Sequence, residues 1–122
     1  MALKRMVLEL GMGTDIRGED YTKAALRAVH NALRQNSLSI ADAFGLNRED
    51  MVVKIIIGAQ KPETIDKQAL ADLLPYGKPQ VVVEHGGMDT LAEDGSRSTI
   101  MVNAALVVYL DLPEGKSWGE AA

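Results

Sequence analysis

The sequence has no cysteine and few aromatic residues, with one Trp, one Phe and three Tyr in 122 residues. The lack of cysteine excludes disulfides, thiolate chemistry and cysteine-based metal sites. Scarce aromatic side chains leave few platforms on which bases can stack. A formal net charge of −4 also argues against nucleic acid, because the phosphate backbone requires clustered Lys and Arg. We therefore expect no nucleic-acid partner.

Long apolar runs are missing as well. The N-terminal residues, which include Lys4, Arg5 and Glu9, show no export signal, and no apolar stretch approaches the ~18 residues of a membrane helix. We expect a cytoplasmic protein that does not bind membranes. The 47% apolar and 25% charged residues are typical of a globular protein with one core. We predict a single α+β domain over residues 1–112 and a tail over residues 113–122.

The periodicity of apolar residues predicts alternating strands and helices. The first strand is expected over residues 3–10, before a glycine-rich loop over residues 11–18. An alanine-rich stripe then predicts a helix over residues 19–35 that lies close against the sheet, with Asp20 as its cap. The remaining expected elements are a connection at 36–50, strands at 52–58, 80–84 and 100–110, and a helix at 63–74.

The two faces of the predicted sheet differ in polarity. If the most apolar set of each strand faces the helices, the other face carries six mixed residues: Arg5, Val7, Glu9, Val52, Lys54 and Ile56. That face is too apolar for open water and too charged for a sealed core. We therefore expect it to pack against copies of the same chain, with Lys54 buried and paired with an acid such as Glu9.

The glycine-rich loop is the first candidate site. Backbone N–H groups at a helix start favour anions, and Arg17 or Lys23 offers charge-assisted hydrogen bonds to a carboxylate or phosphate. The loop matches neither the P-loop nor the complete dinucleotide-binding motif. The alternative is a purely structural loop in which Asp15 accepts hydrogen bonds from local backbone groups.

The second candidate site follows the third predicted strand at Glu84-His85-Gly86-Gly87-Met88-Asp89. His85 is a candidate general acid or base, because loops at strand ends often hold functional side chains on a rigid base. Adjacent strand residues point to opposite faces, so Glu84 is not expected to contact the His85 ring. The alternative is a solvated or structurally hydrogen-bonded histidine.

Other chemistry has weaker support in the sequence. His30 and His85 are far apart and form no short-spaced ligand motif, so we expect no metal and no cofactor, although Asp15, Glu84 and Asp89 remain a conceivable Mg²⁺ set. Ser96 and Ser98 are conceivable nucleophiles if Lys23 or Lys54 activates them. A turn before the last strand is the favoured interpretation of that serine segment.

Two resemblances follow from these residues. The run from Gly11 to Ala25, GMGTDIRGEDYTKAA, resembles the signature of a bacterial family of short conserved hypothetical proteins, with Arg17 where histidine is common. The order of elements, with Asn47-Arg48-Glu49-Asp50 and Met88-Asp89, resembles the trimeric chorismate mutase fold shared with YjgF-type deaminases. This resemblance implies a sheet with two helices on one face, and a homotrimer with clefts between subunits. Gly87 stands where the mutase has a glutamate, so mutase activity is not implied.

The leading functional hypothesis is a protein that binds or converts a small anionic metabolite at clefts between subunits. Its predicted ligand-binding residues are Gly13, Arg17, Thr22, Lys23, Gly86 and Gly87, and its candidate catalytic residues are Asp15 and His85. Asp15, Arg17, Lys23 and His85 are expected to line one cleft. The alternatives are a non-catalytic oligomeric scaffold or regulatory module, and a serine- and lysine-dependent activity resembling that of ring-opening amidohydrolases.

Overall fold

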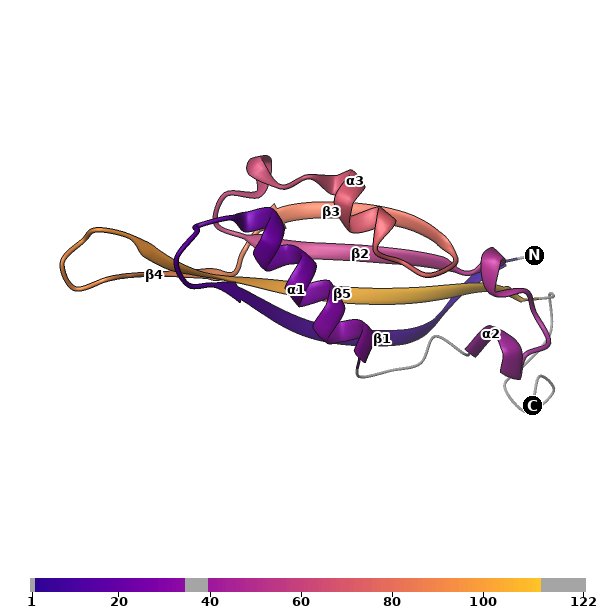
Figure 1. Cartoon of the computed structure of the whole chain (residues 1–122). Coiled ribbons are helices and arrows are strands. Elements are labelled where there is room, and N and C mark those ends of the chain that lie inside the picture. Colours follow the sequence, from indigo (N-terminus) through magenta and orange to yellow (C-terminus); the bar gives the residue numbers. More distant parts are fainter. Residues whose placement is uncertain (1, 35–39, 113–122) are drawn as a thin grey trace.

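The computed structural model describes residues 2–34 and 40–112, so the predicted tail at 113–122 lies outside the described residues. Helices lie between the first three strands, and the last three strands follow one another directly (Figure 1). The elements are β1 (Ala2–Asp15), α1 (Tyr21–Arg34), α2 (Ile40–Ala43), β2 (Val52–Ala59), α3 (Lys67–Asp72), β3 (Lys78–His85), β4 (Met88–Leu91) and β5 (Ser98–Leu112). Single 3-10 turns at Arg48–Asp50 and Pro62–Thr64 precede β2 and α3.

The strands form one mixed sheet in the order β1-β5-β2-β3, and β4 pairs with β5 beyond the end of β2. Strand β5 is antiparallel to both β1 and β2, whereas β3 is parallel to β2. Strands β1, β2 and β3 therefore run in the same direction. As a consequence, Asp15, Ala59 and His85 end their strands at the same edge of the sheet, where β4 begins its hairpin with β5.

Helices α1 and α3 lie on the same face of the sheet (Figure 1), as predicted for an α+β chain. Alternate residues of β2, including Val53, Ile55 and Ile57, are buried beneath them, and so is the even-numbered set of β5 from Ile100 to Leu110. The predicted facing of these two strands is correct. None of the helices in the described ranges is suited to spanning a lipid bilayer.

The predicted facing of β1 is correct for Arg5 but wrong from Val7 onward. A bulge between Arg5 and Val7 shifts the register, so that Leu8, Leu10 and Met12 lie on the face away from the helices, with exposed fractions of 45%, 62% and 53%. In the strand register, Glu9 is aligned with Leu106 on the helix-covered face. Lys54 is aligned with Val107 on the opposite face. The expected pairing of Lys54 with Glu9 is therefore excluded by their placement on opposite faces.

Close packing of α1 on β1 explains this inversion. A Cβ atom on Gly13 would lie 2.1 Å from the Ala24 carbonyl oxygen, and one on Gly11 would lie 2.3 Å from that of Ala28. Such distances leave no room for any side chain on the covered side of this part of β1. The two glycines therefore face the alanine-rich stripe of α1, and the larger apolar residues of β1 face outward.

Three element boundaries also differ from the predictions. Strand β1 continues through Asp15, so the predicted glycine-rich loop is reduced to residues 16–20. The predicted helix at 63–74 is split into the 3-10 turn and the short α3. Asp66 caps α3, since its Oδ1 atom accepts hydrogen bonds from the Gln68 and Ala69 N–H groups at 3.0 and 3.2 Å. Strand β4 occupies part of a segment that was predicted to be a loop.

Candidate functional site

Asp15 holds the turn between β1 and α1 together. The residue is 5% exposed, and its Oδ2 atom accepts a hydrogen bond from the Asp20 N–H at 3.0 Å. This hydrogen bond is the main cause of the lowered pKa of Asp15. Burial raises the pKa, whereas the Gly18 N–H and the charges of Lys23 and Arg27 lower it further. The geometry supports the structural interpretation of this loop, in which Asp15 fixes the backbone.

The other predicted residues of this region have separate surroundings. Asp20 caps α1 as predicted, because its Oδ1 atom accepts the Lys23 N–H at 3.1 Å. The Thr22 hydroxyl accepts the Asp66 N–H at 3.0 Å and thereby connects α1 to the start of α3. Arg17 is exposed in the turn. Thr22 therefore has a structural contact in addition to its predicted ligand-binding role.

Tyr21 and Asp89 join the two candidate loops. The Tyr21 hydroxyl, at the start of α1, donates a hydrogen bond to Oδ2 of Asp89 in β4. Burial, followed by the hydrogen bond and negative charge of Asp89, raises the pKa of Tyr21 to about 12. The tyrosine therefore remains protonated at neutral pH. The glycine-rich segments around Gly13 and Gly87 thus lie at one end of the sheet and are held there by a side-chain contact.

The turn between β3 and β4 depends on its glycines. Gly87 has φ +64°, and a Cβ atom on it would lie 2.3 Å from the Met101 carbonyl oxygen. The Gln60 side chain donates a hydrogen bond to the Gly86 carbonyl at 2.8 Å. These contacts give Gly86 and Gly87 a backbone role that does not require a ligand.

A first hollow lies beside this turn on the face of the sheet opposite the helices. Its volume is about 290 Å³, and its lining includes His85, Gly86, Gly87, Asn103 and Leu10. The His85 side chain is exposed at this place. The register aligns His85 with the buried Ala59, so its side chain leaves β3 toward the helix-covered face, and the hollow itself combines the Asn103 amide and Glu84 with apolar surface from the neighbouring strands.

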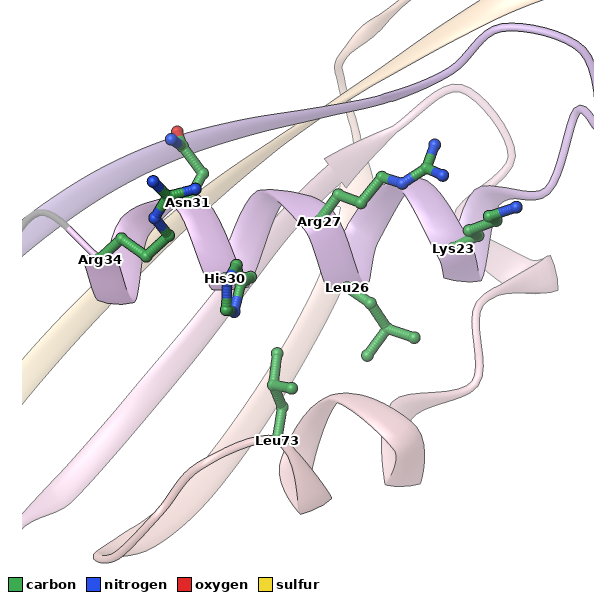
Figure 2. A pocket seen from close by; sticks show the side chains of 7 residues that line it. All are labelled: Lys23, Leu26, Arg27, His30, Asn31, Arg34 and Leu73. Carbon is green, nitrogen blue, oxygen red and sulfur yellow. The ribbon is translucent and has the colours of Figure 1, made fainter.

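A second hollow runs along the outer side of α1 and is called the basic groove here. Its volume is about 460 Å³, and it is lined by Lys23, Leu26, Arg27, His30, Asn31, Arg34 and Leu73. Figure 2 shows Leu26 and Leu73 between α1 and α3, with the nitrogen-bearing side chains distributed along α1. Three of the seven lining residues carry a permanent positive charge, and none is acidic.

Two side chains of the basic groove are fixed by contacts with β1. The Arg27 Nη1 atom donates a hydrogen bond to the Thr14 carbonyl at 2.6 Å and lies 3.8 Å from Oδ1 of Asp15. The Asn31 Oδ1 atom accepts the Met12 N–H at 3.0 Å. Part of the Arg27 charge is therefore directed toward Asp15, whereas Lys23 and Arg34 extend from the two ends of the helix.

The predicted site residues fall into two groups within one chain. Lys23 lines the basic groove, whereas His85 borders the other hollow at the end of β3, with its side chain directed toward the helix-covered face. Asp15 lies between the sheet and the first turn of α1. A cleft shared by Asp15, Arg17, Lys23 and His85 stays a prediction.

The conceivable metal and serine sites do not assemble in one chain. Asp15 and Asp89 both align with Ile100 on the covered face, whereas Glu84 aligns with Gly58 on the other face. Within the described ranges, no three acidic or histidine residues are grouped as metal ligands. Ser96 uses its hydroxyl to donate to Asp94 at 2.6 Å, which fits the turn interpretation of the segment.

Sequence reasoning missed Arg27, His30 and Arg34 as candidate binding residues. All three are exposed on the solvent side of α1. The fourteen residues of α1 contain no Asp or Glu. A one-sided basic helix in an acidic chain was the available signal, because like charges on one helix face repel each other unless an anion is nearby.

Comparisons with known proteins agree on an uncharacterised family. The family model described as "Conserved hypothetical protein (Lin0512_fam)" matches residues 5–108. A crystal structure of an FtsZ-like protein of unknown function from Nostoc punctiforme is similar with a TM-score of 0.82 and 31% identity, covering 92% of this chain and 99% of that chain. No curated protein matches. These findings support the predicted conserved family, and they do not confirm the chorismate-mutase-like fold name.

Proposed function

The chain belongs to the conserved hypothetical protein family Lin0512_fam, and we propose that it binds a small anionic metabolite. The observation that carries this proposal is the basic groove. Lys23, Arg27 and Arg34 surround a hollow of about 460 Å³ without any acidic lining residue, in a chain whose net charge is −4. A local cluster of one sign attracts ligands of the opposite sign, even on a molecule of the same overall sign as the ligand.

The lining also limits the ligand class. Lys23 and Arg34 supply charge-assisted hydrogen bonds suited to carboxylate or phosphate oxygens, and His30 adds an imidazole N–H donor. Leu26 and Leu73 offer apolar contact beside these groups. We propose a metabolite with one or two anionic groups and a small apolar part. The geometry supports binding, and it provides no nucleophile beside the cations.

Calorimetric titration at low ionic strength tests this proposal with three probes: inorganic phosphate, sulfate and citrate. Arg34→Gln is expected to weaken binding by about threefold or more, in line with the loss of one exposed ion pair. Lys67→Gln is the matched control, because Lys67 is an exposed cation at the start of α3 and does not line the groove. Binding equally affected by both variants would reflect overall charge and would contradict a site at the groove.

The second component of the proposal is self-association through the open face, defined as the sheet face away from α1 and α3. Its exposed large apolar residues are Leu3, Leu8, Leu10, Met12, Val82 and Met88. Contiguous apolar surface on a folded protein commonly marks an interaction site. The resemblance to the chorismate mutase fold predicts a trimer, whereas this proposal requires only that another copy covers the open face. The hollow beside the end of β3 opens on this same face.

Light scattering over a micromolar concentration series tests the assembly. Leu10→Lys is expected to shift the protein toward the monomer, because it places a charge at the centre of the apolar surface. Leu91→Lys serves as the control, since Leu91 is 64% exposed in the β4–β5 hairpin, outside the central sheet. A wild-type protein that is monomeric at every concentration would contradict self-association.

A further inference from the structure

The charged residues at the centre of the open face are placed in a self-complementary way. The register aligns Leu8, Val107, Lys54 and Gln80 in one row across the strands, Leu10, Ala105, Ile56 and Val82 in the next, and Met12, Asn103, Gly58 and Glu84 in the third. The middle row is entirely apolar. The first row has one cation, Lys54, and the third has one anion, Glu84.

We infer that this face pairs with a second copy of the chain so that Lys54 of each copy meets the partner's Glu84. The inference rests on the proposed self-association and names the contact that orients it. Glu84 aligns with Gly58, four residues beyond Lys54 on β2. The two charges are therefore separated by about 13 Å along the strands and about 5 Å across them.

A two-fold axis that lies in the interface and passes between Ile56 and Val82 exchanges the two charged positions. The strands of the two copies then cross at a shallow angle, as in aligned packing of two sheets, where the angle is about 30°. The same operation places Leu10 over the partner's Met12. Apolar side chains thus meet apolar side chains, and both charges are matched twice, once on each side of the axis.

Desolvation explains why the match matters. Lys54 is half-buried between Val107 and Ile56 in the single chain, and a second sheet would remove it from the remaining water. A buried ammonium without an anion is strongly disfavoured, so the cover over Lys54 must supply a carboxylate. Glu9 is on the other face, and Glu84 of the same chain is about 13 Å away. Asp111, the other acid of this face, lies beyond the row that holds the cations Arg5 and Lys78, so we match Lys54 with the partner's Glu84.

Other charges on this face do not oppose the arrangement. Arg5 and Lys78 lie in the row next to Lys54, and Asp111 lies beyond them, all on the side away from Glu84, where β1, β2 and β3 start. Lys78 Nζ is already 3.9 Å from Oδ1 of Asp50. Both cations fall at the rim of the paired faces, where water remains available.

A charge-swap experiment tests the inference by sedimentation velocity of the full chain. Lys54→Glu and Glu84→Lys are each expected to weaken self-association by about tenfold or more, because each places like charges opposite each other. The double variant restores the opposite-charge pairs in reversed order, so it is expected to regain most of the wild-type affinity. Unfolding curves of all four proteins check that the substitutions leave the fold intact.

The outcomes separate this inference from the proposal on which it rests. If the wild type assembles and Leu10→Lys weakens it, but the double variant is no tighter than the singles, the Lys54–Glu84 contact is overturned while self-association stands. A trimer overturns the two-fold arrangement, and a monomeric wild type overturns both ideas. If a reversed charge prevents folding, Lys54→Gln and Glu84→Gln provide the readout, since each is expected to reduce the salt dependence of association.

Discussion

At the scale of single residues, several side chains expected to bind a ligand are already used by the fold. Asp15 fixes the turn before α1, and the Thr22 hydroxyl contacts the start of α3. Both residues were predicted as site residues because polar groups near glycines and a helix start are typical of anion sites. The same groups are equally typical of turns and caps, and only the coordinates distinguish the two.

The lowered pKa of Asp15 predicts a pH dependence of stability. A carboxyl whose pKa in the folded state is below the unfolded value of 3.8 stabilises the protein above that pH, and this contribution is lost as the pH falls through the folded-state pKa. Asp15→Asn is therefore expected to be less stable than wild type at pH 7, with the difference shrinking below about pH 4. Urea unfolding at several pH values measures this. Glu93→Gln, in the exposed β4–β5 turn, is the control for removing one negative charge at a site away from the β1–α1 turn.

Thr22 offers a second prediction at this scale. Thr22→Val keeps the shape of the side chain but removes the acceptor for the Asp66 N–H. The expected cost is about 0.5–1.5 kcal/mol in the free energy of unfolding. Thr22→Ser retains the hydroxyl and is expected to recover most of this difference. Equal loss in both variants would show that the methyl group matters and the hydrogen bond does not.

At the scale of elements, the contact between α1 and β1 is set by residues without side chains. The alanine stripe of α1 correctly predicted a helix lying close against the sheet. The strand beneath it was assigned the wrong face, because the rule that larger apolar residues face the core fails where the backbones nearly touch. Gly11 and Gly13 carried the information, since alternate glycines in a strand indicate close approach of another backbone.

Substitution of Gly13 tests this packing. Gly13→Ala would place a methyl group 2.1 Å from the Ala24 carbonyl oxygen, so α1 must move away from β1. The expected loss is about 1–3 kcal/mol, the usual cost of overpacking. Gly58→Ala is the matched control, because its Cβ atom would meet its nearest neighbour at 3.4 Å, an ordinary contact. Chemical denaturation of both variants gives the comparison.

The sequence predicted most of the helices and strands, but fewer of the strand pairings and tertiary contacts between them. Strands β2 and β5 were predicted with correct facing because each has a nearly complete apolar set on one side. Strand β4 was missed, since Met88–Leu91 is short and becomes a strand only by pairing with β5. The contact between Tyr21 and Asp89 joins residues 68 positions apart, and no local pattern indicates it. The basic groove was accessible only as a charge asymmetry, because its walls come from two separate helices.

At the scale of the whole molecule, the two proposed surfaces lie on opposite faces of one sheet. The basic groove is built on α1 and α3, whereas the open face is formed by the strands alone. Two binding sites are coupled only if the protein has two conformations and each ligand binds one of them more tightly. The layer between the two surfaces is a tightly packed sheet and helix interface, which we expect to keep one conformation. The two sites are therefore expected to act independently.

This independence is a testable expectation. Leu10→Lys should shift the mass toward the monomer and leave phosphate affinity within about twofold of wild type, because sites without shared contacts give additive effects. Arg34→Gln should weaken phosphate binding and leave the mass unchanged. Light scattering and calorimetry on the same samples provide both readouts. If phosphate binding is lost together with the oligomer, then residues from two copies must form the anion site, and the predicted cleft shared by Lys23 and His85 between subunits would be favoured over the groove within one chain.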